Sequence, residues 1–255
     1  MLFQAHRGVS TEYPENTMPA FEAAYAQGYQ VIELDPAFTA DGQCVTFHDK
    51  TVNRTCRHLD GTVIAEETPV ADLTYDQLQQ LDAGLFMGQR FAGTKVPLLS
   101  QVLSYASRVG VLVKLDNKFE SKFTPQQQAR FFEIVECSGA RVAFTCKYPE
   151  TISKVVERFP DSQIHYDGVV TEENVARVKA LLKNNPLTVW LALPSELTSW
   201  VTVPMASPQL CEMVKRYGNL GVWILETREQ LEQAKVLGAD IIETTGSIKP
   251  ECMRN

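Results

Sequence analysis

The sequence VIELD at residues 31–35 is a short apolar run that ends with two acidic residues, Glu33 and Asp35. Its length and its β-branched residues predict a β-strand. Runs of the same kind recur along the whole chain. Together with the first they make nine candidate strands, at residues 2–5, 31–34, 44–47, 111–115, 142–144, 163–166, 189–193, 222–225 and 240–242.

Helix starts are marked between many of these candidate strands by a hydroxyl side chain, often with a proline or glutamine just after it. They are Thr17 with Pro19, Thr124 with Pro125, Ser207 with Pro208, and Thr227 with Gln230 three residues later. The hydroxyl can cap the free N–H groups of the first turn, where a proline loses no hydrogen bond. The sequence therefore predicts helices that alternate with the strands.

Steady alternation of strands and helices predicts an α/β fold with a parallel sheet and helices outside it. Eight such units close into a TIM (β/α)8 barrel of about 250 residues, which matches the length of this chain. Nine candidate strands exceed eight, so one lies outside the barrel, and the weakest are 163–166 and 189–193.

Residues 50–97 interrupt this alternation with turn signals at Asp60-Gly61, Gly84, Gly88 and Gly93. We expect this segment to be an insertion after the third strand that covers one barrel mouth. Alone it is too short to bury a large core. The sequence has no repeat or linker, so residues 1–255 are expected to form a single domain.

The composition is that of a globular protein, with 44% hydrophobic residues and a formal net charge of −7. This acidity argues against nucleic acid or an anionic membrane surface as the main partner. No apolar run approaches the roughly 18 residues of a transmembrane helix, and the first residues do not resemble a secretory signal. The six cysteines are scattered, so we expect a cytoplasmic protein with reduced thiols.

Polar side chains follow four of the predicted strands, at the ends that form the active face of a barrel. They are His6 and Arg7, then Glu33 and Asp35, then His48 and Asp49, and finally Lys114, Asp116 and Lys118, which the fourth strand would place on one face. A single histidine at such an end is more often a structural loop residue, and an acidic pair can be solvated. Their combination favours a site, whereas His58 and His165 are expected to be structural.

Carboxylates that converge in a barrel mouth repel one another unless they are protonated or bind a cation. Oxygen ligands select Mg²⁺ or Ca²⁺ over zinc. Two histidines suit general acid and base roles near neutral pH, and the Arg7 guanidinium matches a phosphate. The set predicts phosphodiester cleavage. A magnesium-dependent barrel lyase or isomerase that removes a proton beside a carbonyl, and a non-catalytic binding protein, remain alternatives.

Several motifs, in this order and at this spacing, resemble the signature of the glycerophosphodiester phosphodiesterase (GDPD) family of PLC-like phosphodiesterases. The motifs are His6-Arg7-Gly8, Glu15-Asn16-Thr17, Ala20-Phe21, Glu33-Leu34-Asp35, Thr39-Ala40-Asp41-Gly42, His48-Asp49 and Arg54-Thr55, with weaker matches at 96–98, 222–223 and 238–242. The resemblance implies a distorted TIM barrel with a small inserted subdomain after the third strand. It also implies hydrolysis of glycerophosphodiesters to glycerol 3-phosphate and an alcohol.

The same resemblance assigns roles to individual residues. It implies that the catalytic acid and base are His6 and His48, that the metal ligands are Glu33, Asp35 and Asp116, and that the substrate contacts are Arg7, Lys118 and Trp223. In the family, a glycerol hydroxyl of the substrate attacks the phosphorus, and water then opens the cyclic phosphate.

The chain departs from the family pattern in three places. The usual Glu-x-Lys of the fourth strand corresponds either to Asp116 and Lys118 or to Lys114 and Asp116; we prefer the first, which keeps a carboxylate ahead of a cation. Trp223 is followed by Ile224-Leu225-Glu226 instead of Thr-Val-Asn, and core packing is an equally good role for it. Glu243-Thr244-Thr245 replaces the usual Thr-Asp.

Overall fold

Eight parallel strands close into a barrel in the computed structural model, which describes residues 1–193 and 205–250. Around the barrel they are β1 (Leu2–Ala5), β2 (Val31–Leu34), β5 (Leu112–Leu115), β6 (Val142–Cys146), β7 (Gln163–Tyr166), β8 (Leu187–Ala192), β9 (Asn219–Leu225) and β10 (Ile241–Thr244). Parallel pairing of β1 with β10, Leu2 opposite Ile241, closes the ring. The predicted TIM barrel is confirmed.

The extra candidate strand is the third one, at 44–47, and not one of the two that looked weakest. Residues 163–166 and 189–193 lie in or overlap the barrel strands β7 and β8. Strand β4 (Cys44–Thr46) instead pairs antiparallel with β3 (Pro36–Phe38) in a separate small sheet. A tight turn at Asp41-Gly42 joins β3 to β4, with Gly42 at φ 76°. Two strands joined by so short a turn are antiparallel, because a parallel pair needs a much longer crossover connection.

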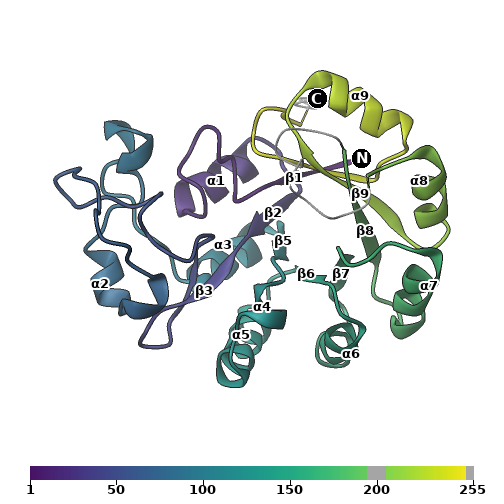
Figure 1. The fold of residues 1–255 in the computed structure, drawn as a ribbon, viewed down its shortest axis with the longest axis horizontal. Helices are drawn as coiled ribbons and strands as arrows, with labels where there is room; N and C mark the ends of the chain where they lie inside the picture. Colours follow the sequence, from purple (N-terminus) through teal and green to yellow (C-terminus); the bar gives the residue numbers. More distant parts are fainter. Residues whose placement is uncertain (194–204, 251–255) are drawn as a thin grey trace.

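The helices surround the barrel (Figure 1). Their bounds are α1 (Met18–Ala26), α3 (Leu99–Val109), α4 (Lys118–Ser121), α5 (Pro125–Ser138), α6 (Pro149–Arg158), α7 (Glu172–Leu181), α8 (Pro208–Lys215) and α9 (Arg228–Val236). Thr124, Ser207 and Thr227 cap α5, α8 and α9 as predicted, each accepting from a backbone N–H in the first turn. The Thr17 hydroxyl accepts no hydrogen bond from the first turn of α1 and instead donates to the carbonyl of Pro14.

Buried side chains form two large groups and a small third one, which consists of Val31, Leu112 and Ala143. The largest group fills the space between the barrel and its helices and includes stacked or tilted rings of Phe119, Phe131, Phe132 and Phe144. The second group consists of Val45, Phe47, Val52, Cys56, Ile64, Val70, Leu78, Ala83 and Val96. We call residues 50–97 the lobe; it holds α2 (Tyr75–Gln79) and three short 3-10 turns at Val70–Asp72, Leu85–Met87 and Gln89–Phe91.

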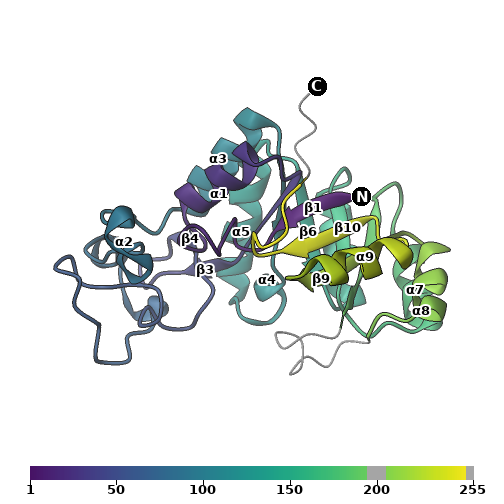
Figure 2. The same cartoon turned by 90° about the horizontal axis from the view of Figure 1, so that it is seen from above.

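The lobe stands to one side of the barrel in two perpendicular views (Figures 1 and 2). Its small core draws on Val45 and Phe47 as well as on residues beyond position 50. The β3–β4 sheet therefore connects the lobe to the barrel and carries His48 at its end.

The end of β5 differs from the prediction. The strand stops at Leu115, and Lys118 is the first residue of α4. Lys114, Asp116 and Lys118 therefore do not share one strand face, and Lys118 reaches the barrel mouth from a helix. In the part of the chain described here, no helix is long and apolar enough to cross a membrane. Five cysteines are free thiols, and Cys252 lies outside the described residues.

Gly8 is the residue after the His6-Arg7 pair, and the fold requires it to be glycine. Its φ is 79°, and a Cβ there would lie 2.7 Å from two atoms of Ala20 in α1. Gly42 has a similar φ of 76°, but a Cβ there would meet no atom within 4 Å. Gly42→Ala therefore isolates the backbone cost that the two positions share.

We expect Gly42→Ala to lower the free energy of unfolding by about 1 kcal/mol, the cost of a left-handed backbone for alanine. Gly8→Ala should lower it by roughly 3 kcal/mol, because overpacking against α1 adds to that cost. Urea denaturation of both variants measures the difference. An equal loss of unfolding free energy in the two variants would show that α1 shifts to accommodate the added methyl group at Gly8.

Candidate active site at the carboxyl ends of the barrel strands

Three carboxylates meet where β2 and β5 end. Glu33, Asp35 and Asp116 each offer an oxygen, and these oxygens lie within 4.8 Å of one another. The two strands are neighbours, and the N–H of Asp116 continues their pairing by donating to the carbonyl of Leu34 at 3.1 Å. An all-oxygen set of this kind suits a hard divalent cation such as Mg²⁺ or Ca²⁺. The structure thus brings together all three carboxylates that the sequence proposed as metal ligands.

Asp35 is buried and surrounded by donors. Arg7 Nε lies 3.3 Å and Lys118 Nζ 3.5 Å from its carboxylate. The amide of Asn16 donates to it at 2.8 Å. Burial opposes ionisation of Asp35, but Lys118 and then Arg7 outweigh burial and lower its pKa. Asp35 is therefore a fixed negative charge at the barrel mouth.

The negative charges of Glu33 and Asp116 are less well compensated by neighbouring groups than the charge of Asp35. Burial, and then repulsion from Asp35 and Glu243, raises the pKa of Glu33 well above its ordinary value. Burial, and then Asp35, raises the pKa of Asp116. The cations nearby do not fully offset the acidic groups, so a divalent cation would relieve their repulsion. The residues present fit the ion that the oxygen ligands predict.

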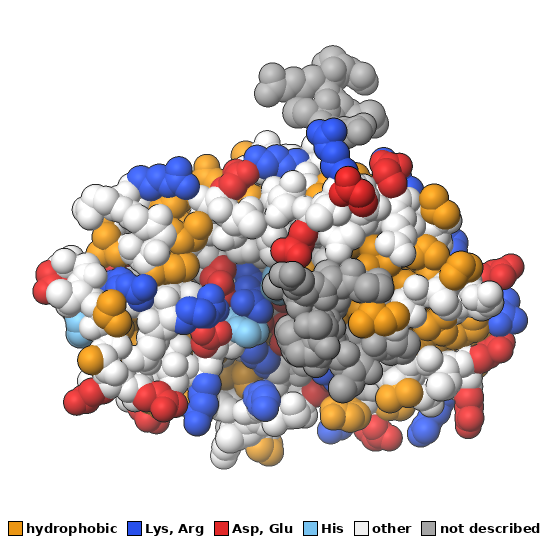
Figure 3. All heavy atoms as spheres, turned by 45° about the horizontal axis from the view of Figure 1, so that its top comes forward, with side chains coloured by type: hydrophobic (Ala, Val, Ile, Leu, Met, Phe, Trp, Pro, Cys, Tyr) orange, Lys and Arg blue, Asp and Glu red, His pale blue; other side chains and the backbone are white. Residues whose placement is uncertain are grey.

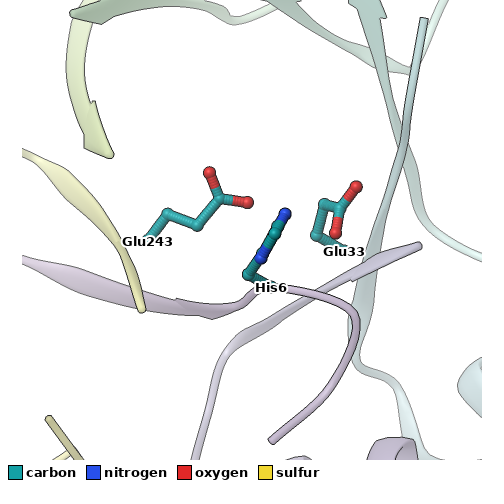
Figure 4. A group of neighbouring side chains, drawn as sticks. All are labelled: His6, Glu33 and Glu243. Carbon is teal, nitrogen blue, oxygen red and sulfur yellow. The ribbon is translucent and has the colours of Figure 1, made fainter. Parts of the chain in front are cut away.

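His6 lies between two carboxylates. Its ring stands between Glu33 and Glu243 (Figure 4), and ligand atoms of the three residues lie within 4.8 Å of one another. Burial is the largest influence on the ring; it lowers the pKa of His6 to about 4, although Glu243 acts in the opposite direction. His6 is therefore neutral at pH 7 and can accept a proton.

His48 follows β4 and is partly open to solvent, with 40% of its side chain exposed. Its Nδ1 lies 2.7 Å from Oδ1 of Asp49. Burial raises the pKa of Asp49, but hydrogen bonds from Arg54 and His48 outweigh it and hold that pKa at about 2. Because the carboxylate is ionised, Nδ1–H donates to it, which leaves Nε2 as the nitrogen that can accept a proton. Figure 3 shows histidine, acidic and basic side chains side by side near the middle of one face.

Arg54 connects the two sides of the site. Its guanidinium donates to Asp49 at 2.6 and 2.9 Å, and to both oxygens of Glu15 at 2.7 Å. Glu15 also accepts from Arg7 Nη1 at 3.0 Å. The sequence motif included Glu15 and Arg54, but sequence reasoning gave neither of them a role.

The three expected substrate contacts lie in different surroundings. Arg7 is largely enclosed by Glu15 and Asp35. Lys118 Nζ donates to the backbone carbonyls of Phe47 and His48 at 2.8 and 2.6 Å, so it holds the segment that carries His48. Trp223 is half-buried on β9.

Sequence reasoning missed a buried ion pair inside the barrel. Lys114 Nζ lies 3.7 Å from Glu243 and 4.3 Å from the centre of the Trp190 ring. Gln4 on β1 donates to the same glutamate at 2.8 Å. The only signal in the sequence was the departure from the family pattern at Lys114 and Glu243.

The two remaining histidines lie elsewhere. His58 is exposed on the lobe. His165 is buried on β7 against Trp190, with ring centres 5.5 Å apart.

Comparison with known proteins connects this geometry to one family. Residues 6–244 match the model of the glycerophosphoryl diester phosphodiesterase family. A glycerophosphodiester phosphodiesterase of Caldanaerobacter subterraneus is 40% identical over 117 residues, which are 46% of this chain and 45% of that protein. Human glycerophosphodiester phosphodiesterase 1 is 32% identical over 155 residues, 59% of this chain and 44% of that protein. The chain thus spans about half the length of the curated relatives it matches.

Solved structures share the fold along nearly the whole chain. A putative glycerophosphoryl diester phosphodiesterase from Silicibacter pomeroyi has a TM-score of 0.76 at 20% identity, with 96% of this chain and 90% of that one covered. An Oleispira antarctica phosphodiesterase in complex with the product sn-glycerol-3-phosphate has a TM-score of 0.75 at 19% identity, with 97% and 94% covered. At these identities the likeness is one of fold.

The carboxylate cluster predicts a specific effect on cation binding. Asp116→Asn keeps the side-chain shape but removes an anionic ligand, so we expect the affinity for Mg²⁺ and Ca²⁺ to fall at least about tenfold. Isothermal titration calorimetry measures it.

Asp167→Asn is the matched control. Asp167 accepts from Asn117 at 2.9 Å and lies outside the cluster, and burial raises its pKa to about 7. Its replacement should change the affinity by no more than about twofold, because this carboxyl is partly neutral at pH 7. Equal losses in the two variants would contradict a site centred on Glu33, Asp35 and Asp116.

Proposed function

The chain belongs to the glycerophosphoryl diester phosphodiesterase family, and on that basis we propose that it hydrolyses glycerophosphodiesters to glycerol 3-phosphate and an alcohol. The observation that carries this proposal is the placement of two histidines beside one cluster of buried carboxylates. His6 lies next to Glu33, and the backbone of His48 is tied to Asp35 through Lys118. The phosphodiesterase of Oleispira antarctica, whose fold is shared, binds sn-glycerol-3-phosphate as its product.

In this proposal a divalent cation, Mg²⁺ or Ca²⁺, is held by Glu33, Asp35 and Asp116. When bound, it supplies positive charge that offsets the charge on the phosphoryl oxygens. Arg7 and Lys118 lie against the same carboxylate, Asp35, and add positive charge at the edge of the cluster. The cation, Arg7 and Lys118 would therefore offset the negative charge of the carboxylates before a phosphodiester anion binds.

The two histidines supply the proton transfers. One takes the proton from a glycerol hydroxyl of the substrate as its oxygen bonds to phosphorus. The other protonates the alcohol oxygen as its bond to phosphorus breaks. The cyclic phosphate that results is opened by water, with the two histidines in exchanged roles.

The local contacts of each histidine suit this work. His6 is neutral at pH 7, so its ring can take a proton, although burial opposes the charge that the ring then carries. His48 is fixed through Nδ1 by Asp49, which Arg54 holds in turn, so Nε2 is the nitrogen left for substrate. A histidine whose second nitrogen is bound to a carboxylate keeps one tautomer and one orientation.

Replacement of either histidine tests the proposal directly. We expect His6→Asn and His48→Asn each to lower kcat by about a hundredfold to ten-thousandfold, the usual share of general acid–base catalysis. His58→Asn, on the exposed surface of the lobe, should leave kcat unchanged. Release of glycerol 3-phosphate from glycerophosphocholine, glycerophosphoethanolamine and glycerophosphoglycerol measures all three. Full activity in a variant that lacks both His6 and His48 would rule out this mechanism.

The cation is tested separately. Dialysis against EDTA should abolish the release of glycerol 3-phosphate, because the carboxylate cluster then repels the phosphodiester. Added Mg²⁺ or Ca²⁺ should restore it, and the ion that restores it at the lower concentration is the preferred one. Undiminished release of glycerol 3-phosphate after exhaustive chelation would show that activity needs no divalent cation. The positive charges of Lys114, Lys118 and Arg7 would then be sufficient to offset the carboxylates.

A further inference from the structure

We propose that Glu243 is a positioning residue for His6, an inference that rests on the function proposed above. Glu243 lies on β10 and is 3% exposed, and one of its carboxylate oxygens lies within 4.8 Å of a His6 ring nitrogen. Figure 4 shows its carboxylate directed at the histidine ring from the side opposite Glu33. Of the two carboxylates beside His6, Glu243 is the one outside the Glu33–Asp35–Asp116 cluster.

The backbone fixes the glutamate and the histidine relative to each other. Strand β1 pairs with β10, with Gln4 opposite Glu243 and Ala5 opposite Thr244. The N–H of His6 continues this pairing by donating to the carbonyl of Thr244 at 3.0 Å. The two side chains therefore leave adjacent strands of one rigid barrel wall.

Two side chains of the barrel wall hold the carboxylate of Glu243 at the same oxygen. Gln4 Nε2 donates to Oε1 at 2.8 Å, and Lys114 Nζ lies 3.7 Å from the same oxygen. Among residues 1–193 and 205–250, no donor bonds to Oε2 of Glu243. Gln4 and Lys114 thus orient the carboxylate through Oε1.

A carboxylate that is fixed beside a buried imidazole stabilises the protonated, positively charged form of the ring. In the proposed mechanism His6 holds a proton during one part of each catalytic cycle, and burial of the ring opposes that charge. The carboxylate of Glu243, which lies beside the ring, offsets this opposition. The benefit arises as His6 becomes charged, so it affects the chemical step more than substrate binding.

The test is a double-mutant cycle between Glu243→Gln and His6→Asn. In the wild-type background, Glu243→Gln should lower kcat by about tenfold to a hundredfold and change KM by no more than about twofold. In the His6→Asn background it should cause no further loss, because there is no imidazole left to stabilise. An equal loss in both backgrounds, or no loss in either, would overturn the inference.

A second variant separates positioning from simple charge balance. Lys114→Met with Glu243→Leu removes both members of the buried pair and leaves an apolar barrel wall, an exchange that proteins often tolerate. This variant should fold and show at least the kcat loss of Glu243→Gln. Wild-type kcat would mean that Glu243 serves only to balance Lys114, which overturns the inference.

The same measurements distinguish this inference from the proposed function. If the wild type releases glycerol 3-phosphate and His6→Asn does not, the proposed function stands and the Glu243 variants alone decide the inference. If the wild type releases none from any of the three glycerophosphodiesters, the proposed function fails, and the inference fails with it.

Discussion

Asp35 is the buried negative charge on which the arrangement of the site depends. Removing a carboxylate from water is costly unless donors replace the lost solvation. Arg7, Lys118 and Asn16 provide them, and the two cations also connect to the histidines. Arg7 directly follows His6, and Lys118 holds the backbone at His48. The two cations that compensate Asp35 are therefore also tied to the two histidines, Arg7 through the sequence and Lys118 through a hydrogen bond.

The barrel could be predicted from the sequence because its signals are local. A strand-sized apolar run and a helix cap each involve only a few neighbouring residues, and their alternation allows few folds. What stays hidden is which apolar run joins the barrel. Residues 44–47 are as apolar as a barrel strand, yet they pair in a hairpin, while β7 carries Gln163 and His165 and still completes the ring. Pairing partners decide this, and they lie far away in the sequence.

The candidate site, like the fold, has a part that the sequence predicts and a part that it does not. His6, Glu33, Asp35, His48 and Asp116 stand at or near strand ends, where position along the chain predicts convergence, and the structure places Glu33, Asp35 and Asp116 together. The contacts of Lys118 with the carbonyl of His48, and of Lys114 with Glu243, span 70 residues and more. They depend on barrel register and on where β5 gives way to α4, which no short motif encodes.

The contacts of Arg54 lie in a short segment at the start of the lobe, which affects where the sequence of the lobe can vary in evolution. The residues that hold the site from the lobe side, His48, Asp49 and Arg54, all lie at or just before its first turns. The rest of the lobe packs around its own small core. Substitutions on the exposed surface of the lobe leave the contacts of His48, Asp49 and Arg54 in place, whereas changes in its core act on Phe47, which directly precedes His48. The exposed surface of the lobe is thus a place where selection can vary the surroundings of the site without disturbing the contacts that hold His48.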